Sequence, residues 1–358
     1  MRDSAAVLPM ADSTPEAFHP VSLRDVARSI GASHTAVSLA LRDSPRVSAK
    51  RRREIQTEAE RLGYRPDPML TSLAAYRQAK RPVIIGSTIA WINQWKNPRA
   101  LYRLHEFEAY WKGAQEAASR LGYRLEEFLL NAEMTGARLQ RILLARGVRG
   151  ILIPPHADGA LAISDFDWSH FSVVRLGISV QYPRAHVVTS DQMNCSALAL
   201  ERVLKQGYRR VGYVSSRHFD RRTGGNFRAG FLSSQDALVP AKRQVLPLFL
   251  EEETTPACAR RLRAWIKSAA PDAIISTLPE LASLLQLIGC NVPRDIAVAT
   301  LSVLDGNFDC GVDQNSHEVG LVAMRTLAGL IHVNERGIPR YCRRILVEGR
   351  WVDGSSLP

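Results

Sequence analysis

Short apolar runs alternate with segments of helical periodicity over most of the chain. Runs of this length without polar interruption are typical of strands buried on both faces of a sheet. We expect strands at residues 83–91, 124–130, 150–155, 186–191, 211–216, 245–250, 272–277 and 295–301. Apolar residues recur at helical spacing at 111–121, 138–144, 198–204, around Phe227, near Trp265 and at 280–288. Strands and helices in alternation predict an α/β fold with two parallel sheets, covered on both faces, that lie side by side and leave a cleft.

The segment 21–66 has a different pattern, with short amphipathic helices and no apolar run. Ser22 directly precedes the first helix and Asp25 lies three positions after Ser22, which is the spacing of a capping box. Gly31 can take the left-handed conformation that ends this helix, and Ser33 can cap the next one. A short helix, a four-residue turn and a second helix predict a helix-turn-helix.

The second helix, about residues 34–42, separates into two faces when its residues are placed about 100° apart. Val37, Ala40 and Leu41 fall on the side that must face the core. The other side carries mostly short polar groups that fit the major groove of DNA, and its residues are His34, Thr35, Ser38, Leu39 and Arg42. The alternative is a small helical subdomain with a solvated face. Turn, caps and exposed face agree instead on a recognition helix.

The charge of the chain supports the same interpretation. Residues 21–82 contain 13 Lys or Arg against 6 Asp or Glu, a net charge of +7 out of +12 for all 358 residues. We therefore expect a basic head on a nearly balanced body, which suits phosphate contact and counterion release. The basic run 50–53 taken alone is a solvated helix start, but beside a helix-turn-helix it favours phosphate positioning.

Several motifs in this segment resemble the head of the LacI/GalR family of bacterial transcription regulators. They are D-V-A at 25–27, V-S at 37–38, V-S at 47–48 and L-G-Y-x-P at 62–66. The resemblance implies a homodimer on a near-palindromic double-stranded operator. It also implies that Thr35, Ala36 and Ser38 approach bases or phosphates, that Ser22 and Lys50 help to fix the DNA backbone, and that Tyr64 closes the head.

The chain departs from the family pattern in the recognition helix and in the hinge that follows the head. Leu39 stands where many relatives carry Arg, so an apolar contact, such as one to a thymine methyl group, replaces a donor to guanine. Asp67 and Pro68 can begin a short helix through Leu73, which matches the family leucine that wedges into the minor groove. Leu70 stands where a smaller Ala is typical, which weakens the case for tight pairing of two hinge helices.

The resemblance continues more loosely to residue 356, where the family has a body similar to a periplasmic sugar-binding protein. It implies a head at 21–66, a hinge and linker at 67–82, and a body at 83–356. We expect one lobe at about 83–185 plus 301–327 and the other at 186–300 plus 328–356. Residues 1–20 have mixed polarity without a signal-peptide pattern, and we expect a disordered tail.

The predicted ligand cleft departs further from the family. Phe227 and Leu278 stand where many relatives have an Arg and an Asp that hydrogen-bond the ligand. We expect an effector, either a carbohydrate or a related metabolite, to be held by stacking, by amides and by charged groups. The candidate residues are Trp91, Asn93, Trp95, Asp191, Asn194, Asn226 and Arg228. Burial in the core or a dimer contact is an equally good interpretation of the two tryptophans.

Two other functions stay open from the sequence. One is a DNA-binding regulator without an effector that answers to a partner protein, an alternative that Phe227 and Leu278 support. The other is an enzyme, but the chain lacks G-x-S-x-G, G-x-G-x-x-G and G-K-[ST] signatures, and His105–Glu106 lacks the second His of a zinc helix. We therefore expect no catalytic residues, metal or cofactor. Five scattered cysteines without a C-x-x-C pair, and no apolar run of about 20 residues, indicate a cytoplasmic protein that does not enter membranes.

Overall fold

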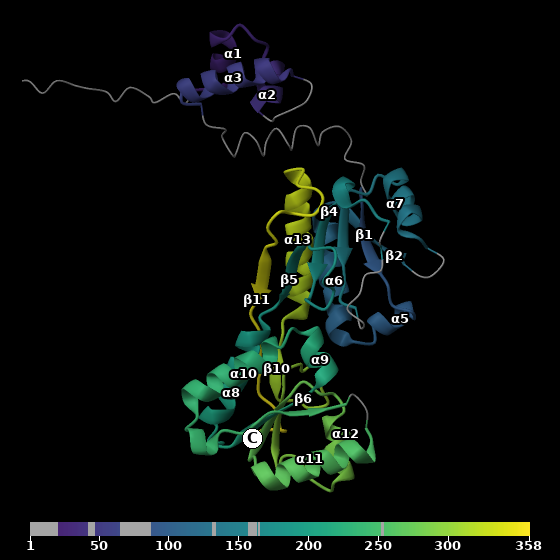
Figure 1. The fold of residues 1–358 in the computed structure, drawn as a ribbon, viewed down its shortest axis with the longest axis vertical. Coiled ribbons are helices and arrows are strands. Elements are labelled where there is room, and N and C mark those ends of the chain that lie inside the picture. The colour runs from purple at the N-terminus through teal and green to yellow at the C-terminus, as the bar shows by residue number, and fades with distance from the viewer. Residues whose placement is uncertain are drawn as a thin grey trace, which may run out of the picture. The chain divides into compact units, whose positions relative to one another are not determined.

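The computed structural model describes residues 21–41, 47–64, 87–130, 134–156, 163, 165–251 and 254–358. The chain divides into two compact units, a head within residues 1–81 and a body within residues 82–358 (Figure 1). Each unit has its own hydrophobic core.

The head consists of three helices, α1 (Leu23–Ser29), α2 (His34–Leu41) and α3 (Ala49–Arg61). Its core is formed by Val26, Ala27, Val37, Ala40, Ile55 and Ala59. All three helices contribute to it, which fixes their packing because none could bury its apolar face alone.

Polar contacts cap the starts of α1 and α2, and a glycine forms the turn between the two helices. The backbone N–H of Ser22 donates to the Asp25 carboxylate at 2.9 Å, and the backbone N–H of Ala36 donates to Ser33 Oγ at 3.1 Å. Gly31 has a φ of +58°, in the left-handed region that favours glycine. These contacts confirm the caps and the glycine turn that the sequence predicts. Arg51 adds a bond from Nη2 to the carbonyl of Ile30 at 3.0 Å, which ties α3 to the end of α1.

The body has two lobes, each built around a six-stranded sheet (Figure 1). The first sheet is parallel throughout and has the order β11-β5-β4-β3-β1-β2. Its strands are β1 (Ser87–Asn93), β2 (Tyr123–Leu129), β3 (Gly150–Ile153), β4 (Ser172–Leu176), β5 (His186–Ser190) and β11 (Arg344–Val347). Strands β3, β4 and β5 are buried at every position, as expected for strands covered on both faces.

The second sheet has the order β12-β10-β9-β8-β6-β7, and only β12, which pairs with β10, runs antiparallel. Its strands are β6 (Val211–Ser216), β7 (Leu248–Leu250), β8 (Ala273–Ser276), β9 (Ala297–Thr300), β10 (Gly311–Asp313) and β12 (Arg350–Val352). One parallel sheet and one that is parallel except for β12 confirm the α/β fold that the alternating pattern predicts.

Helices cover both faces of each sheet. In the first lobe, α6 (His105–Arg120) and α13 (Ser316–His332) pack on one face, and α7 (Gly136–Ala145) and a 3₁₀ turn, η1 (Trp168–His170), pack on the other; α5 (Pro98–Leu101) is a short helix before α6. In the second lobe, the helices are α8 (Gln192–Lys205), α9 (Arg217–Arg222), α10 (Asn226–Leu238), α11 (Pro256–Ala269) and α12 (Leu281–Leu287), with a 3₁₀ turn, η2 (Ala241–Arg243). Helices α8 and α10 contribute to one core cluster, and α11 and α12 to the other.

The chain crosses between the lobes three times, after β5, after β10 and after β11. Neighbouring crossings are hydrogen-bonded to one another. Ser190 Oγ donates to Gln314 Oε1 at 2.7 Å, the backbone N–H of Asp191 donates to the carbonyl of Val347 at 2.8 Å, and Asn315 Nδ2 donates to the carbonyl of Glu348 at 2.7 Å. These three bonds hold the crossings together as one hinge region.

The crossings correct the lobe boundaries expected from the sequence. Strands β5 and β11 belong to the first sheet and β10 belongs to the second. The first lobe therefore contains residues 87–190 and 316–347, and the second contains 191–315 and 348–358. Strands β10 and β12 have three residues each, too few for their periodicity to assign them to a sheet. Strand β4 and helix α13 were not among the expected elements.

Candidate DNA-binding face and ligand cavity

Helix α2 presents a polar face outside the core of the head. His34 and Thr35 are exposed, and Ala36, Ser38 and Leu39 are partly exposed. Val37 and Ala40 are fully buried on the opposite side, and Leu41 packs against the same core. The exposed face is therefore the one that the sequence predicts for base contact, whereas Arg42 lies outside the described residues.

The other predicted DNA contacts lie at helix starts and at the end of the head. Lys50 is exposed in the first turn of α3, and Ser22 precedes α1 with its hydroxyl donating to Asp25 at 2.6 Å. Tyr64 packs against the core of the head and is half-buried, in keeping with a closing role. Leu73 and the rest of the hinge lie outside the described residues.

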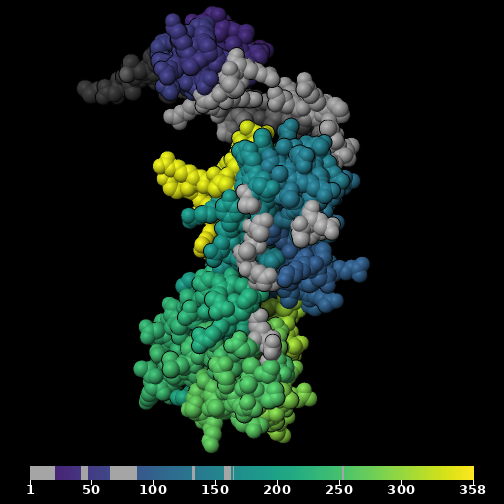
Figure 2. Space-filling model, turned by 45° about the vertical axis from the view of Figure 1, so that its right-hand side comes forward, coloured from purple at the N-terminus to yellow at the C-terminus, as the bar shows by residue number. Residues whose placement is uncertain are grey.

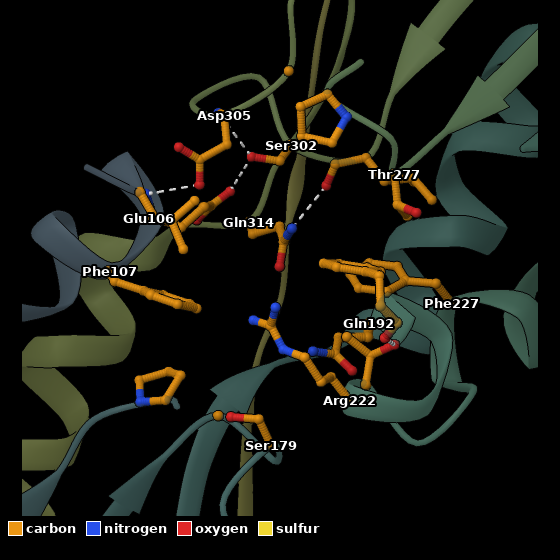
Figure 3. A pocket seen from close by; sticks show the side chains of 18 of the residues that line it. Glu106, Phe107, Ser179, Gln192, Arg222, Phe227, Thr277, Ser302, Asp305 and Gln314 are labelled. Carbon is orange, nitrogen blue, oxygen red and sulfur yellow. Dashed lines mark hydrogen bonds between the residues drawn. The ribbon is translucent and has the colours of Figure 1, made fainter. Parts of the chain in front are cut away.

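A cavity of about 240 Å³ lies where the two lobes meet (Figure 3). The first lobe contributes the start of α6, Pro155 after β3 and residues 177–179 after β4. The second lobe contributes the start of α8, the region of α9 and α10, and the loops after β8 and β9. Gln314, in the crossing after β10, also lines it. Most of these segments follow the carboxyl ends of parallel strands, where ligand sites form in open α/β sheets.

Glu106 connects the two lobes at the wall of this cavity. Its carboxyl group accepts a hydrogen bond from Ser302 Oγ of the second lobe at 2.5 Å and another from Ser316 Oγ at the start of α13. Burial raises the pKa of Glu106 to about 7, against the opposing effect of the two hydroxyl donors.

Asp305 makes a second connection between the lobes. Its carboxylate accepts hydrogen bonds from the backbone N–H groups of His105 at 2.6 Å and Glu106 at 3.3 Å. These groups are at the N-terminus of α6, where unpaired N–H donors and the helix dipole favour an anion. The loop 302–305 of the second lobe is thereby docked on a helix of the first.

Aromatic rings and polar groups face each other inside the cavity. Phe107 of the first lobe and Phe227 of the second lie on opposite sides, and the Arg222 side chain points into the space between the lobes (Figure 3). Gln192 and Gln314 add two amides to the lining, and Ser179 adds a hydroxyl group. A flat, hydroxylated molecule could stack on the rings and bond to these groups.

The structure places the predicted tryptophan pair elsewhere. Trp91 is fully buried in the core of the first lobe and contacts Trp111 edge to face, so the core alternative is correct for this residue. Asn93 is also buried, and its side chain bonds to Glu127, to the carbonyl of Pro98 and to the backbone of Trp95. Trp95 donates from Nε1 to the carbonyl of Pro155 at 3.0 Å, so it supports the cavity wall from behind.

The other four candidates also lie outside the lining. Asp191 caps α8 by accepting from the backbone N–H of Asn194 at 3.1 Å, and Asn194 is exposed. Asn226 donates to Gln192 at 3.3 Å and thus contacts a lining residue without lining the cavity itself. Arg228 is exposed and pairs with Asp220 at 3.3 Å. The effector-site prediction therefore needs correction, since none of its seven residues lines the cavity. On α10, Phe227 faces the cavity, whereas Arg228 lies on another side of the same helix.

The lining residues that the sequence did not indicate include Glu106, Phe107, Gln192, Arg222 and Gln314. Phe227, which departs from the family pattern, does face the cavity. Leu278 is buried, while its neighbours Thr277 and Pro279 line the site. A signal for Gln192 was available, since it directly follows the aspartate at the end of a predicted strand.

No described helix is both long and apolar enough to cross a membrane. In the same part of the chain, no group of three or more His, Cys, Asp or Glu side chains is arranged to hold a metal ion. The five cysteines are free thiols.

A helix-turn-helix head and a two-lobed body with an interlobe cavity define a DNA-binding transcription regulator. Residues 22–67, which contain the head, match the model of the family of bacterial regulatory proteins known as the lacI family.

Comparison with known proteins extends the likeness to the body. The HTH-type transcriptional regulator MalR of Streptococcus pneumoniae is 23% identical over 353 residues, which is 93% of this chain and 99% of MalR. The structure of the transcriptional regulator CelR in complex with cellobiose has a TM-score of 0.55 and 18% identity, covering 94% of this chain and 99% of CelR. A LacI family regulator from Enterococcus faecium with bound ribose has a TM-score of 0.53 and 17% identity, covering 75% of this chain and 98% of its own. At these identities, the structural likeness shows the shared fold.

Proposed function

We propose that the protein is a cytoplasmic, homodimeric repressor whose operator affinity is controlled by a small molecule bound in the interlobe cavity. The head supplies sequence recognition through the exposed face of α2. The observation that carries the proposal is the composition of the cavity, because both lobes and the crossing residue Gln314 line it. A molecule held there contacts both lobes and the hinge at once.

The cavity also constrains the ligand. At about 240 Å³ it is smaller than the roughly 300 to 1,000 Å³ of most ligand pockets, so we expect a molecule no larger than one sugar ring. Phe107 and Phe227 provide faces for the apolar sides of such a ring. Gln192, Gln314 and Arg222 provide the polar contacts. The sugars in the structures of CelR and of the E. faecium regulator support a carbohydrate or a related metabolite.

Control of DNA binding follows from the way the lobes are joined. Ser302 and Asp305 of the second lobe bond to the start of α6 in the first, at the cavity wall. A ligand that favours one arrangement of these contacts shifts the balance between lobe arrangements. It changes operator affinity only by the difference in its affinity for the two arrangements.

The test combines operator selection with ligand binding. The protein is used to select duplexes from a random-sequence pool, and calorimetry then measures binding of a panel of monosaccharides, sugar acids and sugar phosphates. For the compound that binds, Arg222→Ala should weaken binding at least about tenfold, equal to about 1.4 kcal/mol. Arg228→Ala is the matched control, since Arg228 lies on the neighbouring helix outside the lining, and it should leave the affinity unchanged.

If Arg228→Ala weakens binding of the compound and Arg222→Ala leaves it unchanged, the cavity is not the effector site. A protein that selects duplexes but responds to no compound of the panel would favour the alternative, a regulator that answers to a partner protein.

A further inference from the structure

The positive charge of the body is concentrated in one lobe. Residues 83–358 contain 33 Lys or Arg and 26 Asp or Glu, a net charge of +7, so the expectation of a nearly balanced body is wrong. The first lobe with its preceding residues, 83–190 and 316–347, has 17 basic and 11 acidic residues, a net of +6. The second lobe, with 16 basic and 15 acidic residues, has a net of +1.

Five exposed arginines of the first lobe lie along or beside the edge where its strands begin. Arg149 directly precedes β3, Arg184 precedes β5 by two residues, and Arg344 is the first residue of β11. Arg336 and Arg340 are in the segment that leads from α13 to β11, which projects from the first lobe (yellow in Figure 2). Because neighbouring strands in this sheet are parallel, their amino ends share one edge. We call these five residues the basic edge.

Interactions inside the protein do not account for the basic edge. Arg146 caps α7 and pairs with Glu126, and Arg343 pairs with Glu335 at 2.7 Å, so these neighbours have a structural role. Within the described residues, by contrast, the five arginines of the edge have no carboxylate partner, although Arg340 lies over the ring of Tyr341 at 5.2 Å.

The effect of these charges reaches a buried neighbour. The pKa of Arg175 on β4 is lowered first by burial and then, among other effects, by the positive charges of Arg344 and Arg184. The two exposed arginines therefore contribute positive potential at this edge of the sheet. A potential of this kind attracts an anionic partner, and its extension along several strands suits a polyanion better than a single small anion.

The position of the edge in the chain indicates which polyanion. Strand β1 begins at Ser87 between β2 and β3, so the chain that follows the head enters the sheet at this same edge. We propose that the basic edge binds DNA phosphates while the head reads the bases, so that the body itself contributes a sequence-independent part of the affinity. This inference rests on the proposed function, since it requires that the head bind DNA.

The proposal has a measurable electrostatic signature. Each phosphate neutralised by a basic side chain releases counterions, and the slope of log K against log salt changes by about 0.9 for each contact. Contacts to phosphates do not distinguish sequences. Loss of the edge should therefore weaken selected and random duplexes by the same factor.

The experiment uses the full chain with Arg149→Gln, Arg184→Gln and Arg340→Gln combined. Binding to a selected duplex and to a random-sequence duplex of equal length is measured over a range of salt concentrations. We expect the affinity at physiological salt to fall about tenfold or more on both duplexes, and the slope to decrease by up to about 2.7 units per protomer. The corresponding triple Arg→Lys variant keeps the charges and should bind like the parent.

The matched control replaces Arg202, Arg209 and Arg260 of the second lobe by Gln. These arginines are exposed and have no carboxylate partner in the described part of the chain, so the control removes the same charge elsewhere. The proposal is overturned if the edge variant keeps the slope and affinity of the parent, or if the control lowers both as much. A parent protein that selects no duplex would instead contradict the proposed function.

Discussion

At the scale of single residues, Glu106 is a carboxyl group enclosed between the lobes. Its two hydroxyl donors come from Ser302 in the second lobe and Ser316 at the start of α13. Burial nevertheless raises its pKa to about 7, from an ordinary value of 4.5. The group therefore changes its charge near physiological pH at a point where the two lobes touch.

The folded state favours the protonated form of Glu106, so its contribution to the free energy of unfolding is present below about pH 4.5 and is lost as the pH rises through 7. Glu106→Gln keeps the shape and removes the ionisation. Denaturant unfolding from about pH 5 to pH 8 should show the parent losing stability relative to this variant, by on the order of 3 kcal/mol. Glu108→Gln, at a partly exposed position on the same helix, controls for the loss of one charge. A constant difference between parent and Glu106→Gln over this range would contradict the assignment.

At the scale of elements, helices α6 and α13 approach each other closely enough to require glycine. A Cβ atom at Gly113 would lie 1.9 Å from the carbonyl oxygen of His317, and one at Gly320 would lie 2.1 Å from that of Tyr110. The close approach seals one face of the first sheet and holds the start of α6 beside the cavity.

Gly320→Ala should lower the free energy of unfolding by about 1 to 3 kcal/mol, because the new methyl group meets backbone that cannot move aside. Gly329→Ala in the same helix is the matched control, since a Cβ there meets no atom within 4 Å. It should be stabilising by about 0.5 to 1 kcal/mol through helix propensity. Denaturant titration of both variants decides, and equal effects would show that the helices are not in contact as described.

Helix α2 and the start of α3 should act on DNA in different ways. Thr35 lies on the exposed face of the recognition helix, and Thr35→Ala should cost about 1 to 3 kcal/mol on a selected duplex and relax its specificity. Lys50→Ala should weaken all duplexes alike and reduce the salt slope by about one unit. Salt-titrated binding measures both effects. If both variants bind like the parent, the head has been assigned the wrong face.

At the scale of the whole molecule, the proposed function predicts an assembly of two copies of the chain. The head is small and covers one half-site, whereas a two-fold pair doubles the contacts at a fixed spacing.

We therefore expect sedimentation at micromolar concentration to give the mass of a dimer. The selected duplexes should contain an inverted repeat with half-sites about one helical turn apart, or a multiple of that spacing. A monomer in sedimentation, together with duplexes that lack any repeat, would rule out this assembly.

The extent to which the sequence predicted the sites differs between head and body. The recognition face of α2 depends on residues within one turn of each other, so periodicity and caps predicted Thr35 and Ser38 on the outside and Val37 on the inside. The cavity is lined by residues from Leu104 to Gln314 that meet only after two sheets have formed. Trp91 lies in a strand as expected, but its side chain is buried in the core and does not reach the cavity.

The sequence by itself determined the elements whose signals are local. These are the head with its caps and turn, the alternation that produces two mostly parallel sheets, and the resemblance of residues 22–67 to the lacI family. Only the tertiary structure decided which lobe holds β5, β10 and β11, which side of α10 faces the cavity, and where the unpaired arginines gather. The physical reason is that local periodicity states which side of an element is apolar, whereas a site depends on which elements become neighbours, and that is decided by long-range packing and the crossings of the chain.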